Sequence, residues 1–366
     1  MFTSWCECFM QTEKEYVTML HGAGGSVMHD FIKKYILRSF IDLGGGNFDV
    51  SLEALDDAAA FGNIVLKSDS HVVKPIFFPG GDIGRLAVSG TVNDIAVMGA
   101  KPLALACGLI LEEGLPMSDL ERILNSIRET CIEADVAIVT GDTKVVEKGS
   151  LGGCIINTSG IGVRTEELER NLSVVKKYRA DFESRWLLDS NLKVGDKIVV
   201  SGTIGDHGLA VLSAQEGLNF GGEISSDVQP LNRIIQRLLG EVGGIVAMKD
   251  PTRGGLADAL NEYSEKSGVG ILIYEDKIPI KESVKAACEI LGLDPLEVGN
   301  EGKVIIGVVK EKADEVLDFL RETEKGKDAE IIGEVVDDFR GVAIQTIIGG
   351  RRIVARPLGD PIPRIC

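Results

Sequence analysis

The chain has 366 residues, of which 44% are hydrophobic and 26% are charged, and its formal net charge is −17. This length is too great for a single hydrophobic core and predicts two domains. The negative charge argues against nucleic-acid binding and against attachment to an anionic membrane, since both require a basic surface. It does not exclude a nucleotide, because a few local cations or a metal ion can reverse the local field.

The cysteines indicate a reducing environment. There are seven, an odd number, and no two of them form a CxxC pair, so a structural zinc site is not expected. The first twenty residues lack the apolar run of a signal peptide, and no segment is long enough to span a bilayer. We therefore expect a cytoplasmic protein with free thiols. Cys6 and Cys8 are interpreted as incidental, and small core residues are expected at Cys107, Cys131, Cys154 and Cys288.

The first half of the chain alternates strands and helices after a loose extension at 1–18. A glycine-rich segment and a helix at 27–40 occupy 19–44, and the first α/β domain is expected at 45–165. Within it, the pattern predicts strands at 63–78, 102–113, 137–146 and 152–163, and helices at 82–100 and 116–134.

A polar stretch at 164–186 has no clear apolar period and marks a linker, which we assign to 166–195. A second α/β domain follows at 196–350, and a tail at 351–366. The predicted class is therefore α/β, with two distantly similar domains. In the second domain, strands are expected at 197–205, 269–275, 303–310, 329–336 and 342–355, and helices at 207–217, 231–242, 254–268, 280–292 and 313–326.

The stretch "HGAGG" contains Gly22, Gly24 and Gly25, directly before the first predicted helix. Glycines let backbone N–H groups approach an anion closely, so this segment is a candidate phosphate-binding loop. It does not match the P-loop pattern, and it does not follow a strand as a dinucleotide-binding turn does. A flexible hinge is the alternative interpretation.

Acidic residues interrupt four apolar segments of the first domain. Asp57 lies in "DDAA", Asp69 in a strand, Asp94 inside an apolar helix, and Asp142 after a strand, two residues before Lys144. A carboxylate in an apolar segment is costly unless it is paired or bound to a metal. The set favours Mg²⁺ and a nucleotide, with Lys144 as a cation for phosphate. The alternative is that each Asp caps a helix or a turn.

Three tight turns of the second domain, "GDHG", "DPTRGG" and "GNEG", each carry a charged or titratable side chain. Arg253 and His207 are candidates for contact with phosphate or substrate, and Glu301 and His207 are candidates for a general base. Ordinary turns are the alternative for all three.

The chain closes with "GDPIPRIC". Pro361 and Pro363 disfavour helix, so residues 358–366 are expected to be extended and could reach about 30 Å. A free cysteine has a pKa of about 8.5. The α-carboxylate of Cys366 would raise that pKa and Arg364 would partly offset the effect. The stretch is therefore interpreted as an arm that carries a thiol into an active site, with an incidental terminal cysteine as the alternative.

Together, these motifs resemble the HypE family of hydrogenase maturation factors, over about Met19 to Cys366. The Asp, Gly and Lys motifs are typical of the wider superfamily of aminoimidazole ribonucleotide synthetase, selenophosphate synthetase and thiamine monophosphate kinase. The closing Pro-Arg-Ile-Cys distinguishes the HypE family from the others.

The resemblance implies a two-domain PurM-like fold whose N-terminal domain forms a β-barrel across a homodimer. It also implies ATP in the cleft, with the glycine-rich segment over the phosphates, and Mg²⁺. The metal ligands would be Asp69, Asp94 and Asp142. The cofactor would further contact Gly22, Gly24, Gly25, Asp57, Lys144 and Arg253, and the catalytic residues would be Cys366, Lys144, Glu301 and His207.

The implied reaction begins when the carbamoyltransferase HypF places a carbamoyl group on Cys366. The chain then uses ATP to dehydrate this S-carboxamide to an S-cyanate, which the HypC–HypD complex receives for the cyanide ligands of [NiFe] hydrogenase. No nucleic acid or membrane takes part. Two alternatives stay open: another ATP-using enzyme, either selenophosphate synthetase-like or a small-molecule kinase, and a non-enzymatic tail carrier.

Overall fold

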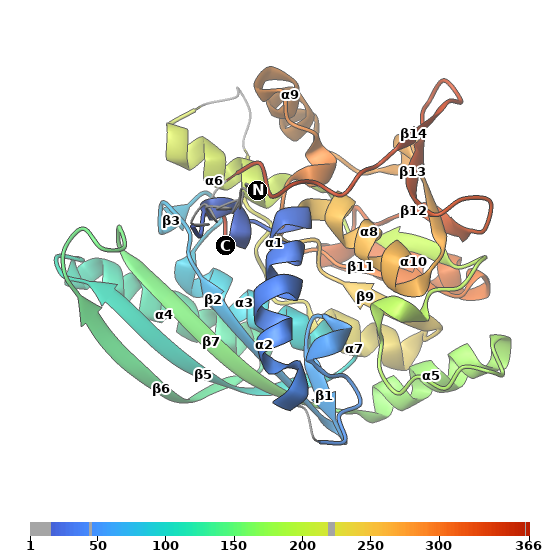
Figure 1. The fold of residues 1–366 in the computed structure, drawn as a ribbon, viewed down its shortest axis with the longest axis horizontal. Helices are drawn as coiled ribbons and strands as arrows, with labels where there is room; N and C mark the ends of the chain where they lie inside the picture. The colour runs from blue at the N-terminus through green and yellow to red at the C-terminus, as the bar shows by residue number, and fades with distance from the viewer. Residues whose placement is uncertain (1–15, 44–45, 219–223, 363) are drawn as a thin grey trace, which may run out of the picture.

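The computed structural model describes residues 16–43, 46–218, 224–362 and 364–366, and shows two mixed sheets, each with its own helices (Figure 1). Cys6, Cys8, most of the expected extension and Pro363 lie outside the described residues. The α/β class is confirmed. No helix in the described part of the chain is both long enough and apolar enough to cross a membrane.

The N-terminal sheet has five strands in the order β1-β2-β7-β5-β6, and α3 packs against β2 and β7. The β5–β6 pair is parallel, because α4 connects the two strands as a crossover, and the other pairs are antiparallel. The elements are β1 (Ala59–Phe61), β2 (Ile64–His71), α3 (Ile83–Val97), β5 (Lys101–Glu112), α4 (Met117–Ala134), β6 (Ala137–Val146) and β7 (Cys154–Val163).

The predicted helices of this domain are confirmed, and one predicted strand is too long. Asp82 begins α3 by accepting hydrogen bonds from the amides of Gly84 and Arg85 at 2.7 and 3.0 Å. The strand predicted at 63–78 ends at His71, because Pro75 lacks the N–H that a strand would need. The chain re-forms only a short ribbon, β3 (Phe77–Phe78) with β4 (Gly81–Asp82).

The face of this sheet opposite α3 carries exposed apolar side chains. Leu66 of β2 pairs with Ile161 of β7, and their side chains are 46% and 44% exposed. The edge strand β6 exposes Val139 and Val145 even more, at 66% and 68%. The sheet is open within one chain, since β1 and β6 form its two edges.

The C-terminal sheet has seven strands in the order β14-β13-β10-β12-β8-β11-β9, and only β10 and β13 pair in parallel. The helices α6, α7, α8, α9 and α10 belong to this half of the chain (Figure 1). The strands are β8 (Lys197–Val200), β9 (Ile245–Lys249), β10 (Gly270–Tyr274), β11 (Ile305–Val308), β12 (Glu330–Val336), β13 (Gly341–Gln345) and β14 (Arg351–Ile353), and the helices are α6 (Asp206–Glu216), α7 (Asn232–Glu241), α8 (Gly255–Ser267), α9 (Glu282–Leu291) and α10 (Ala313–Arg321).

Two elements of the structure were not predicted as a helix or a strand. The expected linker contains α5 (Glu166–Tyr178), which Thr165 caps, which packs against α7 and which buries Leu168, Leu172 and Val175. The apolar residues of α5 form only a narrow stripe among many charged residues, and their helical spacing was therefore not recognised in the sequence. The second is β9, which is buried along its whole length and was not predicted.

The N-terminal segment forms a continuous helical stretch of α1 (Gly25–Phe31), a π-helical turn (Ile32–Leu37) and α2 (Arg38–Phe40), close to the helix predicted at 27–40. Two apolar cores support the molecule. The larger joins the C-terminal sheet to the end of α3, and the second contains α3, α4 and two isoleucines of the C-terminal tail. The expected core cysteines are free thiols, with Cys131, Cys154 and Cys288 buried and Cys107 half-buried.

Candidate active site

A cavity of about 400 Å³ is formed by residues of both domains, the N-terminal segment and the tail. Part of its lining is apolar, and part is acidic, with Cys366 among the lining residues. The apolar part includes Met28, Ile32, Leu52, Leu55 and Leu66. A cavity with both kinds of lining suits a ligand that has a flat apolar group and a charged group.

Three carboxylates meet in the acidic part of the cavity. One oxygen each of Asp57, Asp94 and Asp250 lies within 4.8 Å of the others, and Asp57 Oδ2 is buried without a hydrogen-bond partner among the described residues. Burial raises the pKa of Asp94 well above its usual value, and burial together with Asp57 raises the pKa of Asp250 to about 7. Crowded, under-satisfied oxygen ligands of this kind fit a hard divalent cation.

Lys67 brings the predicted Asp69 and Asp94 together. Its Nζ lies 2.5 Å from Asp94 Oδ2 and 3.2 Å from Asp69 Oδ1. Burial alone would raise the pKa of Asp69, but Lys67, His71 and the Thr91 hydroxyl together outweigh burial, so that pKa is lowered. Lys67 was not among the predicted residues, although its position two residues before Asp69 on β2 places both side chains on one face.

Asp142 and Lys144 do not join this group within one chain. They lie on β6, which β7 and β5 separate from β2, so about 14 Å of sheet intervenes. Both side chains are exposed and pair with each other at 2.9 Å, and neither lines the cavity. The predicted trio of Asp69, Asp94 and Asp142 is therefore not assembled by a single chain, and Asp250 stands nearer to Asp94 instead.

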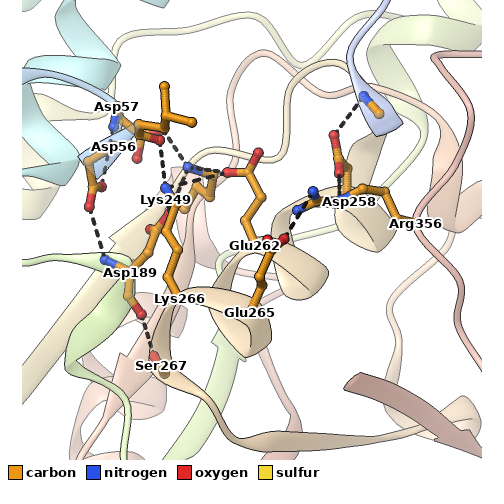
Figure 2. Close-up of polar contacts among 12 residues, drawn as sticks. Asp56, Asp57, Asp189, Lys249, Asp258, Glu262, Glu265, Lys266, Ser267 and Arg356 are labelled. Atoms are coloured by element: carbon orange, nitrogen blue, oxygen red, sulfur yellow. Dashed lines mark hydrogen bonds and ion pairs between the residues drawn. The ribbon is translucent and has the colours of Figure 1, made fainter. Parts of the chain in front are cut away.

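A buried ionic network supports the cavity (Figure 2). Lys249 Nζ, at the end of β9, lies 2.7 Å from Asp57, 3.2 Å from Asp189 and 3.0 Å from Glu262, and Lys266 adds a second ammonium 2.7 Å from Asp189. Burial would lower the pKa of Lys249, but the surrounding carboxylates raise it well above its usual value. The network holds Asp57 in place, and none of its lysines was predicted.

The glycine-rich segment contacts the tail more than the cavity. Gly24 lines the cavity, but the amide of Gly25 donates to Asp258 Oδ2 at 2.8 Å, and the amide of Ser26 donates to the Pro357 carbonyl at 2.9 Å. Gly25 has a φ of +68°, and a Cβ there would lie 2.4 Å from the Pro357 oxygen. The glycine is thus needed for close packing on the tail, and these amides already have protein partners.

Gly22 and Arg253 interact at the rim of the cavity. Arg253 Nη1 donates to the Gly22 carbonyl at 3.0 Å, and a Cβ on Gly24 would lie 2.9 Å from the Arg253 carbonyl oxygen. The predicted cofactor contacts Gly24 and Arg253 both line the cavity, whereas Gly22 reaches it only through Arg253.

The predicted tail (351–366) begins with β14, and its last part, residues 357–366, which is called the tail from here on, is docked against the protein. Ile362 and Ile365 are buried in the second core, and the Arg364 carbonyl accepts a hydrogen bond from the Lys74 amide at 3.2 Å. The described residues of the tail form no helix or strand, as the prolines predicted. This arrangement brings Cys366 to the cavity.

The environment of Cys366 does not activate its thiol. Burial raises the pKa of that thiol, Arg253 opposes this effect, and Glu301 adds to it. Burial and Asp227 also raise the pKa of Glu301 well above its usual value. The cavity therefore brings the predicted Cys366, Glu301 and Arg253 together, and its polarity suits a thiol that carries a group rather than one that attacks.

His207 has a different position from the one predicted. It does not line the cavity; its Nε2 lies 2.7 Å from the Ile365 carbonyl oxygen and its Nδ1 lies 2.8 Å from Ser226 Oγ. Burial lowers the pKa of the ring, so neutral His207 donates from Nε2 to the tail. With both ring nitrogens engaged, His207 binds the tail and is not placed to act as a general base.

Both domains of the chain are similar to domains of known proteins. The N-terminal domain of AIR synthase related proteins matches residues 55–164, and the C-terminal domain of the same group matches residues 193–345. A putative hydrogenase expression/formation protein of Methanocaldococcus jannaschii is 53% identical over 96% of this chain and 99% of its own length. A carbamoyl dehydratase HypE of Azotobacter vinelandii is 44% identical over 96% of this chain and 97% of its own length.

Solved structures agree with these relatives. A chain in the crystal structure of a HypE–HypF complex is 51% identical, superposes with a TM-score of 0.78, and covers 88% of this chain and 99% of its own. The crystal structure of a hydrogenase maturation protein HypE in complex with ATP is 41% identical, with a TM-score of 0.76 and coverage of 94% and 98%.

Proposed function

The chain belongs to the HypE family of AIR synthase related proteins, and on this premise we propose that it is an ATP-dependent carbamoyl dehydratase. It converts an S-carboxamide on its own Cys366 to an S-cyanate, which supplies cyanide ligands during hydrogenase maturation. One observation carries the proposal: Cys366 lines the same cavity as the carboxylate cluster, so the tail delivers the substrate to the ATP site.

The cavity suits ATP and Mg²⁺. The apolar lining around Ile32 and Leu66 offers a surface for the adenine ring, and the acidic part would receive the phosphates only with a cation present. Asp57, Asp94 and Asp250 would hold Mg²⁺, because their oxygens cluster and Asp57 Oδ2 lacks a partner among the described residues. Bound Mg²⁺ would neutralise phosphate charge.

The chemistry requires an activated oxygen and a base. The carboxamide oxygen attacks the γ-phosphorus of ATP and ADP leaves; loss of the two amide protons and of the phosphorylated oxygen then forms the C≡N bond and releases phosphate. Lys67 and Arg253 line the cavity as cations for the phosphoryl group. Glu301 is the candidate base, since its carboxyl group lines the cavity beside Cys366.

The carbamoyl group comes from a HypF-type carbamoyltransferase, and the nitrile passes to a HypC–HypD complex, in the cytoplasm. The relative solved as a HypE–HypF complex supports the first partner. The docked thiol is half-buried inside the cavity, so the tail leaves the cavity for carbamoylation and returns for dehydration.

The homodimer is proposed from the exposed face of the N-terminal sheet. Leu66, Ile161 and the apolar residues of β6 would be buried if two such sheets closed a barrel. Asp142 and Lys144 would then lie at the subunit boundary, where the partner subunit's cavity could use them. The predicted role of Asp142 and Lys144 at the ATP site therefore requires this dimer.

Intact mass spectrometry tests the function. Incubation with HypF, carbamoyl phosphate and ATP should give a carbamoyl adduct that then loses one water, and both changes should vanish in Cys366→Ala. An adduct that never loses water would favour a simple carrier. Selenophosphate formed from selenide and ATP would favour the selenophosphate synthetase-like alternative.

A further inference from the structure

The tail contains one buried acidic side chain that the reaction does not use. Asp360 is 8% exposed, and no Lys, Arg or His of the described residues forms an ion pair with it. Its carboxylate accepts backbone hydrogen bonds instead: Oδ1 from the Ile362 amide at 2.9 Å, Oδ2 from the Gly254 amide at 3.2 Å, and a further bond from the Gly299 amide.

These three amides belong to three separate parts of the molecule. Gly254 precedes the first residue of α8, Gly299 lies in the "GNEG" turn, and Ile362 lies in the tail itself. The carboxyl group therefore lies at the N-terminus of a 13-residue helix, where it accepts hydrogen bonds from amides that have no partner within the helix. The Asp360 amide also donates to the Ala23 carbonyl, so four contacts fix this one residue.

The "GNEG" turn is shaped for the docked tail. A Cβ on Gly299 would lie 2.6 Å from Ile365 Cδ1 and 3.1 Å from Asp360 Oδ2. A larger residue at 299 would push away both the carboxylate and the isoleucine next to Cys366. The close approach thus serves tail docking in addition to any role of Glu301.

We propose that Asp360 is a positioning residue that holds the tail in its docked state by joining α8, the "GNEG" turn and the tail through one carboxylate. The inference rests on the proposed function, since that function requires a docked and a released tail. In the docked state Asp360 directs the end of the tail so that Cys366 reaches the cavity. In the released state the amides of Gly254 and Gly299 return to water, and Cys366 is open to the carbamoyltransferase.

This role predicts effects of opposite sign on the two half-reactions. Asp360→Ala leaves three buried amides without an acceptor and so favours the released tail. HypF-dependent carbamoylation of Cys366 should become faster, while ATP-dependent dehydration of a tail that already carries the carbamoyl group should become slower, each by about tenfold. A purely structural defect would slow both.

Tail release can be measured without ATP or partner. Trypsin cleavage after Arg364 needs an undocked tail, because the flanking Ile362 and Ile365 are buried, and intact mass identifies the lost Ile-Cys dipeptide. We expect cleavage about tenfold faster in Asp360→Ala than in wild type. This readout remains valid if the chain proves to have another activity, so failure of the positioning role and failure of the proposed function are distinguishable.

Two variants complete the experiment. Leu358→Ala is the matched control, because its side chain is 72% exposed and should leave cleavage unchanged. Asp360→Asn keeps one acceptor oxygen and carries no charge, so at pH 8 it should be cleaved more slowly than both wild type and Asp360→Ala, which also covers the case in which the alanine variant does not fold. Equal cleavage rates for wild type, Asn and Ala variants, or a loss of both half-reactions, would overturn the inference.

Discussion

The carboxylate cluster and the tail that reaches it are held in opposite ways. Lys249 and Lys67 fix the cluster through buried ion pairs at 2.5 to 3.2 Å, and each ammonium contacts more than one carboxylate. The tail is held by two isoleucines, backbone hydrogen bonds and Asp360. Buried ion pairs suit a site that must stay assembled, whereas the contacts of the tail suit a substrate arm that must leave the site.

Among the predicted changes, the removal of Lys249 should have the largest effect, a loss of stability at the carboxylate cluster. Lys249→Met leaves Asp57, Asp189 and Glu262 without their shared cation, so the free energy of unfolding should fall by about 3–5 kcal/mol. Urea unfolding followed by circular dichroism measures it. Lys193→Met, which breaks an exposed pair with Asp181, should cost less than about 1 kcal/mol. If the free energy of unfolding fell equally in the two variants, the buried ion pairs would stabilise the protein no more than a surface pair does.

A change in the metal cluster should affect turnover more than folding. Asp250→Asn removes one charged ligand, so we expect ATP-dependent dehydration to fall by about a hundredfold, with a higher Mg²⁺ requirement. Single-turnover mass spectrometry on a carbamoylated tail at several Mg²⁺ concentrations measures this. The exposed Asp276→Asn serves as the control. An unchanged Mg²⁺ dependence would remove Asp250 from the proposed set.

The docking of the tail should depend on pH. Burial raises the pKa of Asp360 to about 7 in the docked tail, and three backbone amides and Arg253 only partly oppose it. Because the docked state binds a proton more tightly than the released state, docking is strongest at low pH and weakens as pH rises through about 7. Tryptic cleavage after Arg364 should therefore become about tenfold faster, relative to Asp360→Asn, between pH 6 and pH 8.

The groups that face Asp360 do not titrate in that range. Arg253 stays charged, and burial raises the pKa of the docked Cys366 thiol far above it. The ratio to Asp360→Asn cancels the pH dependence of trypsin itself. A flat ratio would show that Asp360 ionisation does not control release.

The smallest effect concerns the edge strand β6. Mixed dimers of Lys144→Ala and Cys366→Ala chains contain one intact site only if Lys144 serves the partner subunit. Random exchange would then restore about a quarter of wild-type dehydration, whereas neither parent is active. Absence of any activity in the mixture would assign Lys144 to the site of its own chain, and an active Lys144→Ala parent would exclude it from the reaction.

The sequence predicted local features better than contacts between domains. Asp94 was recognised because a carboxylate inside the apolar helix α3 demands a partner, and the prolines predicted a tail without regular structure. The partners themselves, Lys67 and Lys249, were not recognised, since a lysine in a strand gives no sign of which carboxylate it will meet.

The roles of Asp250 and His207 were not predicted correctly, because both depend on contacts with distant parts of the chain. Asp250 was missed because β9, the buried strand before it, was not predicted, so "DPTRGG" was considered only as a turn. His207 was taken for a base, although its neighbour is a tail residue 158 positions away. Such separations are fixed by the tertiary fold and leave no local pattern in the chain.

The pairing of Ser26 with Pro357 has a consequence for how the protein is made. The N-terminal segment is synthesised long before its hydrogen-bond partners in the tail. Contacts between such distant segments form late in folding and break early in local unfolding. Until the tail docks, the N-terminal segment therefore lacks these hydrogen-bond partners and the cavity lacks the part of its lining that Cys366 forms.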